Sequence, residues 1–413
     1  MPALNVALIG YGFMGKAHSS AYAQVGHFFP HLPKVRRKVV CGRGRAGLEA
    51  LARAWDWEEA ETDWRRVIER SDIDVVDVCT PNFLHAEIAI AAAAAGKMVL
   101  CEKPLANTLA EAEAMVAAAA HVPTFVWFNY RRVPAVELAE SLMRQGRIGR
   151  IYQYRACYLQ QWGPDPNRPN SWKMSKRTAG SGANGDLNSH LLDTALMLMG
   201  PIREVSATMQ TFLPEKPDPG RPGQTYQVDI DDAVLVQARF ASGALGSFEA
   251  TRFATGVQND KSFTAHGDSG MLEFHFEDLN HLIYADMASE PDLRGRRRIL
   301  APSTGPPGSP HFWKPGHPIG YEHTFTKSLA DFLAGVDSGK PARPTFEDGL
   351  AVQRLLDAVE RSARDRRWVD LEGEQARPGG AGSGGIAPTE ASAEVGSRTS
   401  PPVKSIRSPL KRR

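Results

Sequence analysis

The sequence predicts an α/β protein in which an N-terminal, doubly wound parallel sheet is followed by a second, α+β domain with a mostly antiparallel sheet. Three observations carry this prediction. Over the first 130 residues, short apolar runs alternate with helix-forming segments, a glycine-rich turn follows the first run, and two later strand-like runs meet at Ser242-Gly243. Parallel strands that are covered on both faces are apolar along their length, as the early runs are.

The first domain is predicted to contain five strands and four helices. Its strands are short and rich in β-branched residues, and its helices have helix-forming compositions in which alanine is prominent. Strands that alternate with helices form β-α-β units, and repeated units give the doubly wound fold. The predicted strands are 6–9, 38–41, 75–79, 98–101 and 124–128, and the predicted helices are 15–25, 44–54, 85–95 and 109–120.

The second domain begins beyond Pro134 with a helical stretch that runs to Arg144, after which strand-like runs dominate. The clearest hairpin joins 233–240 to 244–251, with Gly243 supplying the positive φ of a tight turn. Few helices back these strands, so we expect an α+β module. The other predicted features are a helix from about 184–186 to the stop signal Gly200-Pro201, a loop rich in Pro, Gly and His at 302–318, and helices at 321–336 and 346–365.

The predicted domain boundaries are 1–130 for the first domain, 131–372 for the second and 373–413 for a tail, and the last helices could pack back on the first domain. The tail consists of Gly, Ser, Pro, Ala and Arg without hydrophobic periodicity. Such a segment cannot bury enough apolar surface to offset chain entropy, so we expect it to be disordered.

The charge of the chain is nearly balanced. Its 413 residues carry a net charge of +2, and residues 374–413 contribute +4 of it, from seven Lys or Arg against three Asp or Glu, which leaves −2 for the rest. No field of the whole protein therefore favours nucleic acid or an anionic membrane, and we expect neither as a partner.

The four cysteines, Cys41, Cys79, Cys101 and Cys157, form no C-x-x-C pair, and no histidine cluster has the spacing of metal ligands. We therefore expect no metal site and a reducing, cytoplasmic environment. The N-terminus lacks a charged region followed by an apolar core, and no apolar stretch is long enough for a membrane span, so neither export nor insertion is predicted.

A glycine-rich turn between the first strand and a helix predicts a dinucleotide site. In this context the first glycine permits the tight turn, the second lets the pyrophosphate approach the backbone, and the third lets helix and strand pack closely. Free N–H groups at the N-terminus of the helix then hold the pyrophosphate. The motif G-x-G-x-x-G is formed by Gly10, Tyr11, Gly12, Phe13, Met14 and Gly15.

The choice between NAD and NADP depends on the residues that follow the second strand. An NAD enzyme usually has Asp or Glu there to bind the ribose 2′-hydroxyl, whereas this chain has Gly42, Arg43, Gly44 and Arg45. Arg43 and Arg45 could pair with a 2′-phosphate, which favours NADP. Alternatively they form a solvated basic turn, and NAD is used without a ribose carboxylate.

Polar residues follow the third strand, at Thr80, Pro81, Asn82 and His85. They stand at the carboxyl edge of the predicted sheet, which is where such folds bind ligands. We therefore expect them beside the cofactor, although the same residues could be an ordinary helix cap.

Two groups of residues predict chemistry on an alcohol. Lys103 follows the strand 98–101 and is carried to the same sheet edge, while Asp186, His190 and Asp193 are spaced i, i+4 and i+7, which on an α-helix puts them on one face. Oxidation of a secondary alcohol requires removal of the hydroxyl proton, which His190 can accept near neutral pH. Asp186 could orient the imidazole, and Lys103 could donate to the substrate oxygen. Taken singly, Lys103 could be a surface lysine and Asp186 a charge at a helix start.

The order of the motifs resembles that of the Gfo/Idh/MocA family, which is named after glucose-fructose oxidoreductase and inositol dehydrogenase. After the glycine turn come T-P-N-x-x-H at 80–85, C-E-K-P at 101–104, F-N-Y-R-R at 128–132 and G-S-G-A-x-G-D-x-x-x-H-x-x-D at 180–193. The resemblance covers about residues 4–371. It implies a Rossmann domain, a C-terminal α/β domain with a large open sheet, and assembly as a homodimer or homotetramer through that sheet.

The resemblance also implies a function and a set of site residues. The expected reaction is NAD- or NADP-dependent oxidation of a secondary ring hydroxyl of a sugar, anhydrosugar or cyclitol, with Lys103, Asp186 and His190 as catalytic residues. The motifs look most like those of the family's sugar dehydrogenases, including those for levoglucosan. Further residues expected at the cofactor are Phe13, Met14, Glu102, Asn129 and Arg131, and those expected at the substrate are Tyr158, Gln160 and Trp162, since indoles stack on sugar faces and amides pair with hydroxyls.

Two other functions fit the same fold. One is an NAD-dependent glycosidase, which returns the hydride and shows no net redox change, and the other is a non-catalytic sensor that binds a dinucleotide. The intact set of Lys103, Asp186 and His190 speaks against a sensor, since binding alone does not need it. Release of an aglycone without accumulation of reduced cofactor would identify a glycosidase.

Overall fold

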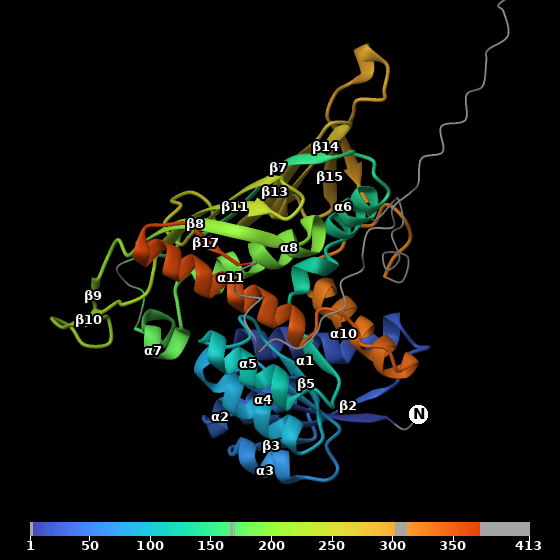
Figure 1. The fold of residues 1–413 in the computed structure, drawn as a ribbon. Coiled ribbons are helices and arrows are strands. Elements are labelled where there is room, and N and C mark those ends of the chain that lie inside the picture. The colour runs from blue at the N-terminus through green and yellow to red at the C-terminus, as the bar shows by residue number, and fades with distance from the viewer. Residues whose placement is uncertain (1–2, 166–167, 169, 302–311, 372–413) are drawn as a thin grey trace, which may run out of the picture. The chain divides into compact units, whose positions relative to one another are not determined.

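Six parallel strands form the first sheet of the computed structural model, which describes residues 3–165, 168, 170–301 and 312–371 (Figure 1). Their order is β3-β2-β1-β4-β5-β6, so the chain reverses its direction of travel across the sheet between β1 and β4. Doubly wound folds bind ligands at this switch point, outside the carboxyl ends of the strands. The strands are β1 (Leu4–Ile9), β2 (Val35–Cys41), β3 (Glu59–Glu61), β4 (Val75–Val78), β5 (Met98–Cys101) and β6 (Thr124–Val126).

The helices between these strands confirm the predicted doubly wound fold. Two elements were missed by the sequence prediction, β3 and α3, because the strand Glu-Ala-Glu contains no apolar run and the helix spans only six residues. The first-domain helices are α1 (Phe13–Phe28), α2 (Arg45–Ala54), α3 (Trp64–Glu69), α4 (His85–Ala94) and α5 (Leu109–Ala118).

Nine strands form the second sheet, in the order β16-β15-β14-β13-β7-β12-β11-β8-β17. All neighbours are antiparallel except β7 and β12, which run parallel, so the predicted mostly antiparallel sheet is confirmed. The predicted hairpin is β11 and β12, and Gly243 in its turn has φ +85°. The strands are β7 (Ile151–Leu159), β8 (Ile202–Gln210), β11 (Ala233–Phe240), β12 (Leu245–Thr251), β13 (Asp260–Gly267), β14 (Gly270–His275), β15 (His281–Asp286), β16 (Arg297–Leu300) and β17 (Val369–Asp370), and a separate pair is β9 (Glu215–Pro217) with β10 (Thr225–Gln227).

The helices of the second half include one departure from the prediction. The helix expected from about residue 184 begins as a π-helical turn over Asn184–Asn188, and α-helical geometry starts only at Ser189. Such turns shift the phase of the side chains that follow and are frequent at functional sites. The α-helices are α6 (Pro134–Arg144), α7 (Lys176–Ala179), α8 (Ser189–Met199), α10 (Tyr321–Ser338) and α11 (Phe346–Asp365).

The last two helices pack back on the first domain. Helix α10 lies against α1, and α11 runs between the two sheets, in contact with α5 on one side and β8 on the other (Figure 1). Phe325 and Phe332 of α10 contact Trp127 and Phe125, with ring centres 5.8 and 6.0 Å apart respectively. These four rings belong to one hydrophobic cluster. Another hydrophobic cluster continues from the first sheet through α11 to the second sheet.

Parts of two predicted segments fall outside the described ranges, namely residues 302–311 of the expected loop and the expected tail at 373–413. Among the described helices, none is both long and apolar enough to cross a membrane.

Candidate active site

The glycine turn is tight at both ends and open in the middle. Gly10 has φ +120°, and a Cβ there would lie 2.5 Å from the carbonyl oxygen of Cys79. A Cβ at Gly15 would lie 2.7 Å from the carbonyl oxygen of Gly10, whereas a Cβ at Gly12 would meet nothing within 4 Å. Gly12 is also the N-cap of α1, whose first turn contains no acidic residue. The backbone at Gly12 therefore offers room and free N–H groups to a pyrophosphate.

The loop after β2 is shaped by Tyr11. A Cβ at Gly42 would lie 2.2 Å from the Tyr11 ring, and one at Gly44 would lie 2.4 Å from the Tyr11 hydroxyl oxygen. A side chain at the place where a ribose-binding carboxylate usually stands would therefore have to displace the Tyr11 ring. Arg43 is exposed, and Arg45, also exposed, pairs with Glu49 at 3.4 Å, as expected of a solvated basic turn.

The polar residues after β4 hold neighbouring loops together. The ring nitrogens of His85 lie 3.0 Å from the carbonyl oxygens of Thr80 and Pro104, and the amide of Asn82 donates to the carbonyl of Ala179 at 3.0 Å. The buried hydroxyl of Thr80 has no hydrogen-bond partner within the described chain. These contacts fix the sheet edge from which Lys103 projects.

Lys103 and Asp186 join the two domains. The ammonium group of Lys103 donates to the main-chain carbonyl of Asp186 at 2.7 Å and to its carboxylate at 3.1 Å. The carboxylate also accepts from Arg252 at 2.9 Å and lies 3.4 Å from the ammonium group of Lys173. Burial alone would raise the pKa of Asp186, but Lys173, Lys103 and Arg252 outweigh it and hold that pKa well below its usual range. Asp186 is therefore a fixed anion.

His190 lies in the first turn of α8 and is surrounded by aromatic rings. The ring centre of Tyr130 is 4.5 Å from that of His190, and the rings of Phe128 and Tyr158 are at 6.0 Å. Burial, Lys103 and Lys261 hold the pKa of His190 well below its usual value, so the imidazole is neutral and able to accept a proton.

Within the described chain, Asp186 makes no hydrogen bond to His190, so the predicted orienting role of Asp186 stays a prediction. The carboxylate of Asp186 pairs with Lys103, Lys173 and Arg252, and that of Asp193 accepts two bonds from Arg131, at 3.0 and 2.6 Å. The spacing of the three residues crosses the π-helical turn at Asn184–Asn188, so it does not follow α-helical geometry throughout.

Asn129 and Arg131, which were expected at the cofactor, have partners within the protein. Arg131 is buried in its ion pair with Asp193, and the amide of Asn129 donates to the hydroxyl of Thr324 at 2.9 Å. Both therefore tie the end of the first domain to helices of the second half.

Each of the three residues expected at the substrate has partners within the protein. The hydroxyls of Tyr158 and Tyr130 are 2.8 Å apart. The amide of Gln160 accepts from the indole of Trp162 at 2.6 Å and donates to Asn259 at 2.7 Å. The guanidinium carbons of Arg168 and Arg252 lie 3.7 and 4.7 Å from the ring centre of Trp162.

Sequence reasoning missed three cations of this site. Lys173 and Arg252 reach Asp186, and the ammonium group of Lys261 donates to the hydroxyl of Thr194 at 2.7 Å in a fully buried position behind His190. No local pattern predicts their partners, because those partners lie far along the chain. One local feature marks Arg252, which is a basic residue directly after a strand whose buried and exposed residues alternate.

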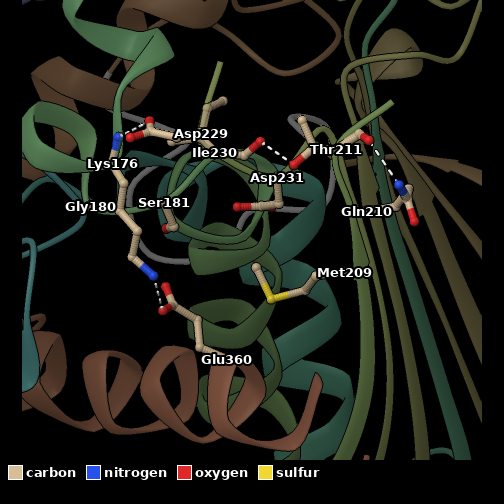
Figure 2. Close-up of a pocket in the computed structure, with 10 residues that line it drawn as sticks. All are labelled: Lys176, Gly180, Ser181, Met209, Gln210, Thr211, Asp229, Ile230, Asp231 and Glu360. Atoms are coloured by element: carbon tan, nitrogen blue, oxygen red, sulfur yellow. Dashed lines mark hydrogen bonds and ion pairs between the residues drawn. The ribbon is translucent and has the colours of Figure 1, made fainter. Parts of the chain in front are cut away.

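A separate cavity of about 180 Å³ is lined by Gly180 and Ser181, which precede Asp186 in the chain, and by Asp229, Ile230 and Asp231 (Figure 2). None of Lys103, Asp186 and His190 lines it, so it is not the candidate active site. The carboxylate of Asp231, on its wall, accepts from the backbone N–H groups of Gly182 and Asn184 at 2.6 and 2.7 Å. Asp231 therefore supports the turn that leads to Asp186. Over the described ranges, no group of His, Cys, Asp and Glu could hold a metal ion.

Two family models match the chain. The model described as an oxidoreductase family with an NAD-binding Rossmann fold matches residues 4–130, and the GFO/IDH/MocA C-terminal domain matches residues 136–273. Levoglucosan dehydrogenase of Pseudarthrobacter phenanthrenivorans is 43% identical over 387 residues, which cover 90% of this chain and 99% of that protein.

Solved structures agree with these matches. An oxidoreductase domain protein from Kribbella flavida has a TM-score of 0.86 at 48% identity, covering 90% of this chain and 100% of that one. A levoglucosan dehydrogenase in complex with NADH and levoglucosan has a TM-score of 0.85 at 44% identity, covering 89% of this chain and 99% of that one.

Proposed function

Because this chain belongs to the Gfo/Idh/MocA family of NAD-binding oxidoreductases, we propose that it oxidises a secondary ring hydroxyl of a sugar or anhydrosugar, with levoglucosan as the first candidate substrate. One observation carries the proposal: Lys103 from the carboxyl edge of the first sheet meets Asp186 from the second domain, and His190 lies in the first turn of the helix that follows.

The residues around the glycine turn fit a bound NAD. Gly12 leaves room in front of the N-terminus of α1, and the unpartnered hydroxyl of Thr80 lies at the same sheet edge. The glycine-lined loop packed on Tyr11, with Arg43 exposed and Arg45 paired with Glu49, supports NAD rather than NADP, since within the described chain neither arginine is held in place for a 2′-phosphate by a contact to the loop.

In the proposed mechanism His190 is the base. Its neutral imidazole accepts the proton of the reacting hydroxyl, and NAD bound at the glycine turn would supply the hydride acceptor for the same carbon. Lys103 donates a hydrogen bond to the substrate oxygen and stabilises the negative charge that develops there. Asp186 keeps the ammonium group of Lys103 in place, and Arg252 and Lys173 keep Asp186 in place.

The outer face of the second sheet supports a proposal on assembly. Strands β11 and β12 alternate buried and exposed residues, so one face packs on the helices and the other is uncovered. Leu235 and Leu245 are each about half exposed on the uncovered side, at 55 and 51%. We propose that two or four copies associate through this face. Light scattering on the protein and on Leu235→Lys tests it, and a monomer in both would contradict it.

Absorbance of reduced nicotinamide cofactor at fixed enzyme concentration tests the catalytic proposal. The protein is mixed with NAD and a panel of levoglucosan, other anhydrosugars, free sugars and inositols. Accumulation of NADH with one of them supports a dehydrogenase. Aglycone release from glycosides without NADH accumulation would replace the proposal by a glycosidase, and cofactor binding without turnover of any compound would replace it by a sensor.

A further inference from the structure

A buried histidine links the helix of the glycine turn to the strand end that carries Lys103. His18 lies in α1 and is fully buried. Its Nδ1 is 2.9 Å from a carboxylate oxygen of Asp77 in β4, and its Nε2 is 3.0 Å from a carboxylate oxygen of Glu102, which follows β5. The other oxygen of Glu102 accepts from the backbone N–H of Lys103 at 3.0 Å. One chain of hydrogen bonds thus runs from α1 to the backbone of Lys103.

The chemistry of the partners favours a charged ring. A neutral imidazole has one N–H group, whereas both neighbours of His18 are carboxylates. Asp77 also accepts from the hydroxyl of Tyr22 at 3.0 Å and from the indole of Trp127 at 2.8 Å, as an ionised carboxylate does. Only an imidazolium can donate to both carboxylates, and without it two negative charges would be buried side by side.

Among the described residues, no Lys or Arg side chain hydrogen-bonds to Asp77 or Glu102 in place of His18. Asp77, Glu102 and Tyr22 are the titratable groups that hydrogen-bond within this cluster, and the rings of Trp127 and Phe325 cover the imidazole at 4.2 and 5.7 Å. Burial alone would lower the pKa of His18, but Asp77 and Glu102 outweigh it and raise that pKa to about 9.

We propose that His18 is a positioning residue for the reaction: as an imidazolium bridging Asp77 and Glu102, it fixes Glu102 and, through Glu102, the backbone from which Lys103 reaches the substrate. The inference rests on the proposed function, in which Lys103 is catalytic. It goes beyond that function because it assigns a task to a residue that touches neither substrate nor cofactor. The bridge also joins α1, the helix that follows the glycine turn, and Lys103 in one charged network.

The competing explanation is that His18 only fills the core. Kinetics on His18→Gln, Glu102→Gln and the double variant separate the two. Gln at 18 can donate to one carboxylate only, so we expect kcat to fall by at least about tenfold while the Kd for NADH stays within about twofold. If His18 acts through Glu102, kcat of the double variant is no lower than kcat of the worse single variant, because Glu102→Gln removes the negative charge that His18→Gln leaves unpaired.

A matched control is Trp57→Phe, which removes a buried hydrogen bond of 3.0 Å to Ser19, the next residue of α1. It should lower thermal stability and leave kcat unchanged. If the fold-losses of kcat in the two single variants multiply in the double variant, His18 has a structural role alone. The same conclusion follows if kcat falls equally in Trp57→Phe.

Nitrogen NMR on the wild-type protein with labelled histidine keeps the inference falsifiable even where a variant fails to fold. The expected result near neutral pH is one exchange-protected ring with both nitrogens protonated, alongside the neutral ring of buried His190. A spectrum in which no exchange-protected ring carries two protons would overturn the charged bridge. Absence of turnover with every sugar would remove the proposed function, and the positioning role with it, while the NMR result would still decide whether the bridge is charged.

Discussion

Lys103 and Asp186, 83 residues apart in the sequence, meet across the two domains with 3.1 Å between the ammonium nitrogen and the carboxylate oxygen. A second bond of 2.7 Å to the main-chain carbonyl of Asp186 holds the lysine from the same side. A cation held by two acceptors is oriented before the substrate arrives, so little reorganisation is needed when negative charge develops on the substrate oxygen.

Replacement of this lysine tests its role in the reaction. Lys103→Met should lower kcat by on the order of a hundredfold or more, because stabilisation of the developing charge is lost, while the Kd for NADH changes little. The matched control is Lys97→Met at the opposite end of β5, where the ammonium group donates to the carbonyls of Arg70 and Ile73. That variant should lose stability and keep its kcat. Equal turnover in wild type and Lys103→Met would remove the lysine from the mechanism.

The base can be tested in the same assay. His190→Ala should lower turnover by on the order of a hundredfold or more and leave dinucleotide binding nearly intact, because no proton acceptor then faces the hydroxyl. Steady-state rates and NADH fluorescence titration measure the two quantities. Unchanged turnover would contradict the assignment.

The pH profile should respond to Lys261, which lies buried behind His190. Lys261 is one of the causes of the lowered pKa of His190, so its removal should raise that pKa and move the acid limb of kcat/KM to higher pH. Burial lowers the pKa of Lys261 itself to about 7, so the ammonium form is present at the acidic pH values where this limb lies. Lys261→Met and, as a control, Lys97→Met can be compared over the same pH range. If the acid limb of kcat/KM stays at the same pH in Lys261→Met, the charge of Lys261 does not affect the pKa of His190.

Cofactor preference can be traced to Tyr11. We expect kcat/KM to favour NAD over NADP by about tenfold or more, and Arg43→Ala to leave the value for NAD nearly unchanged. Gly42→Asp should weaken NAD binding, since its Cβ would overlap the Tyr11 ring, and the added change Tyr11→Ala should restore binding. A preference for NADP that Arg43→Ala abolishes would reverse the assignment.

The imidazolium of His18 predicts a pH dependence of stability. Its pKa is raised to about 9 in the folded protein from an ordinary value of 6.5. The stabilisation is therefore complete below about pH 6.5 and is lost as the pH rises through about 9, with a magnitude on the order of 3 kcal/mol. Denaturant titrations of wild type and His18→Gln at about pH 7 and pH 10 should converge at the higher pH. Curves that stay parallel would contradict a charged His18.

Local patterns predicted most elements but not the partners of the site residues. Strand β5 and helix α11 have the predicted bounds, because a short apolar run and a long amphipathic run each signal one structure. The position of Asp186 relative to His190 could not be predicted, because the spacing argument assumed 3.6 residues per turn through a segment that is π-helical. Arg252 and Lys173 could not be predicted as partners of Asp186, since contacts between distant segments depend on the whole fold and not on spacing.

The aromatic contacts between α10 and the first domain have a consequence for synthesis of the protein. Trp127 and Phe125 emerge from the ribosome early, yet the rings that shield them, Phe325 and Phe332, are among the later residues translated. Until α10 has been translated, Phe125 and Trp127 of the nascent first domain lack these partners and are exposed. In that state, chaperone binding or self-association competes with folding.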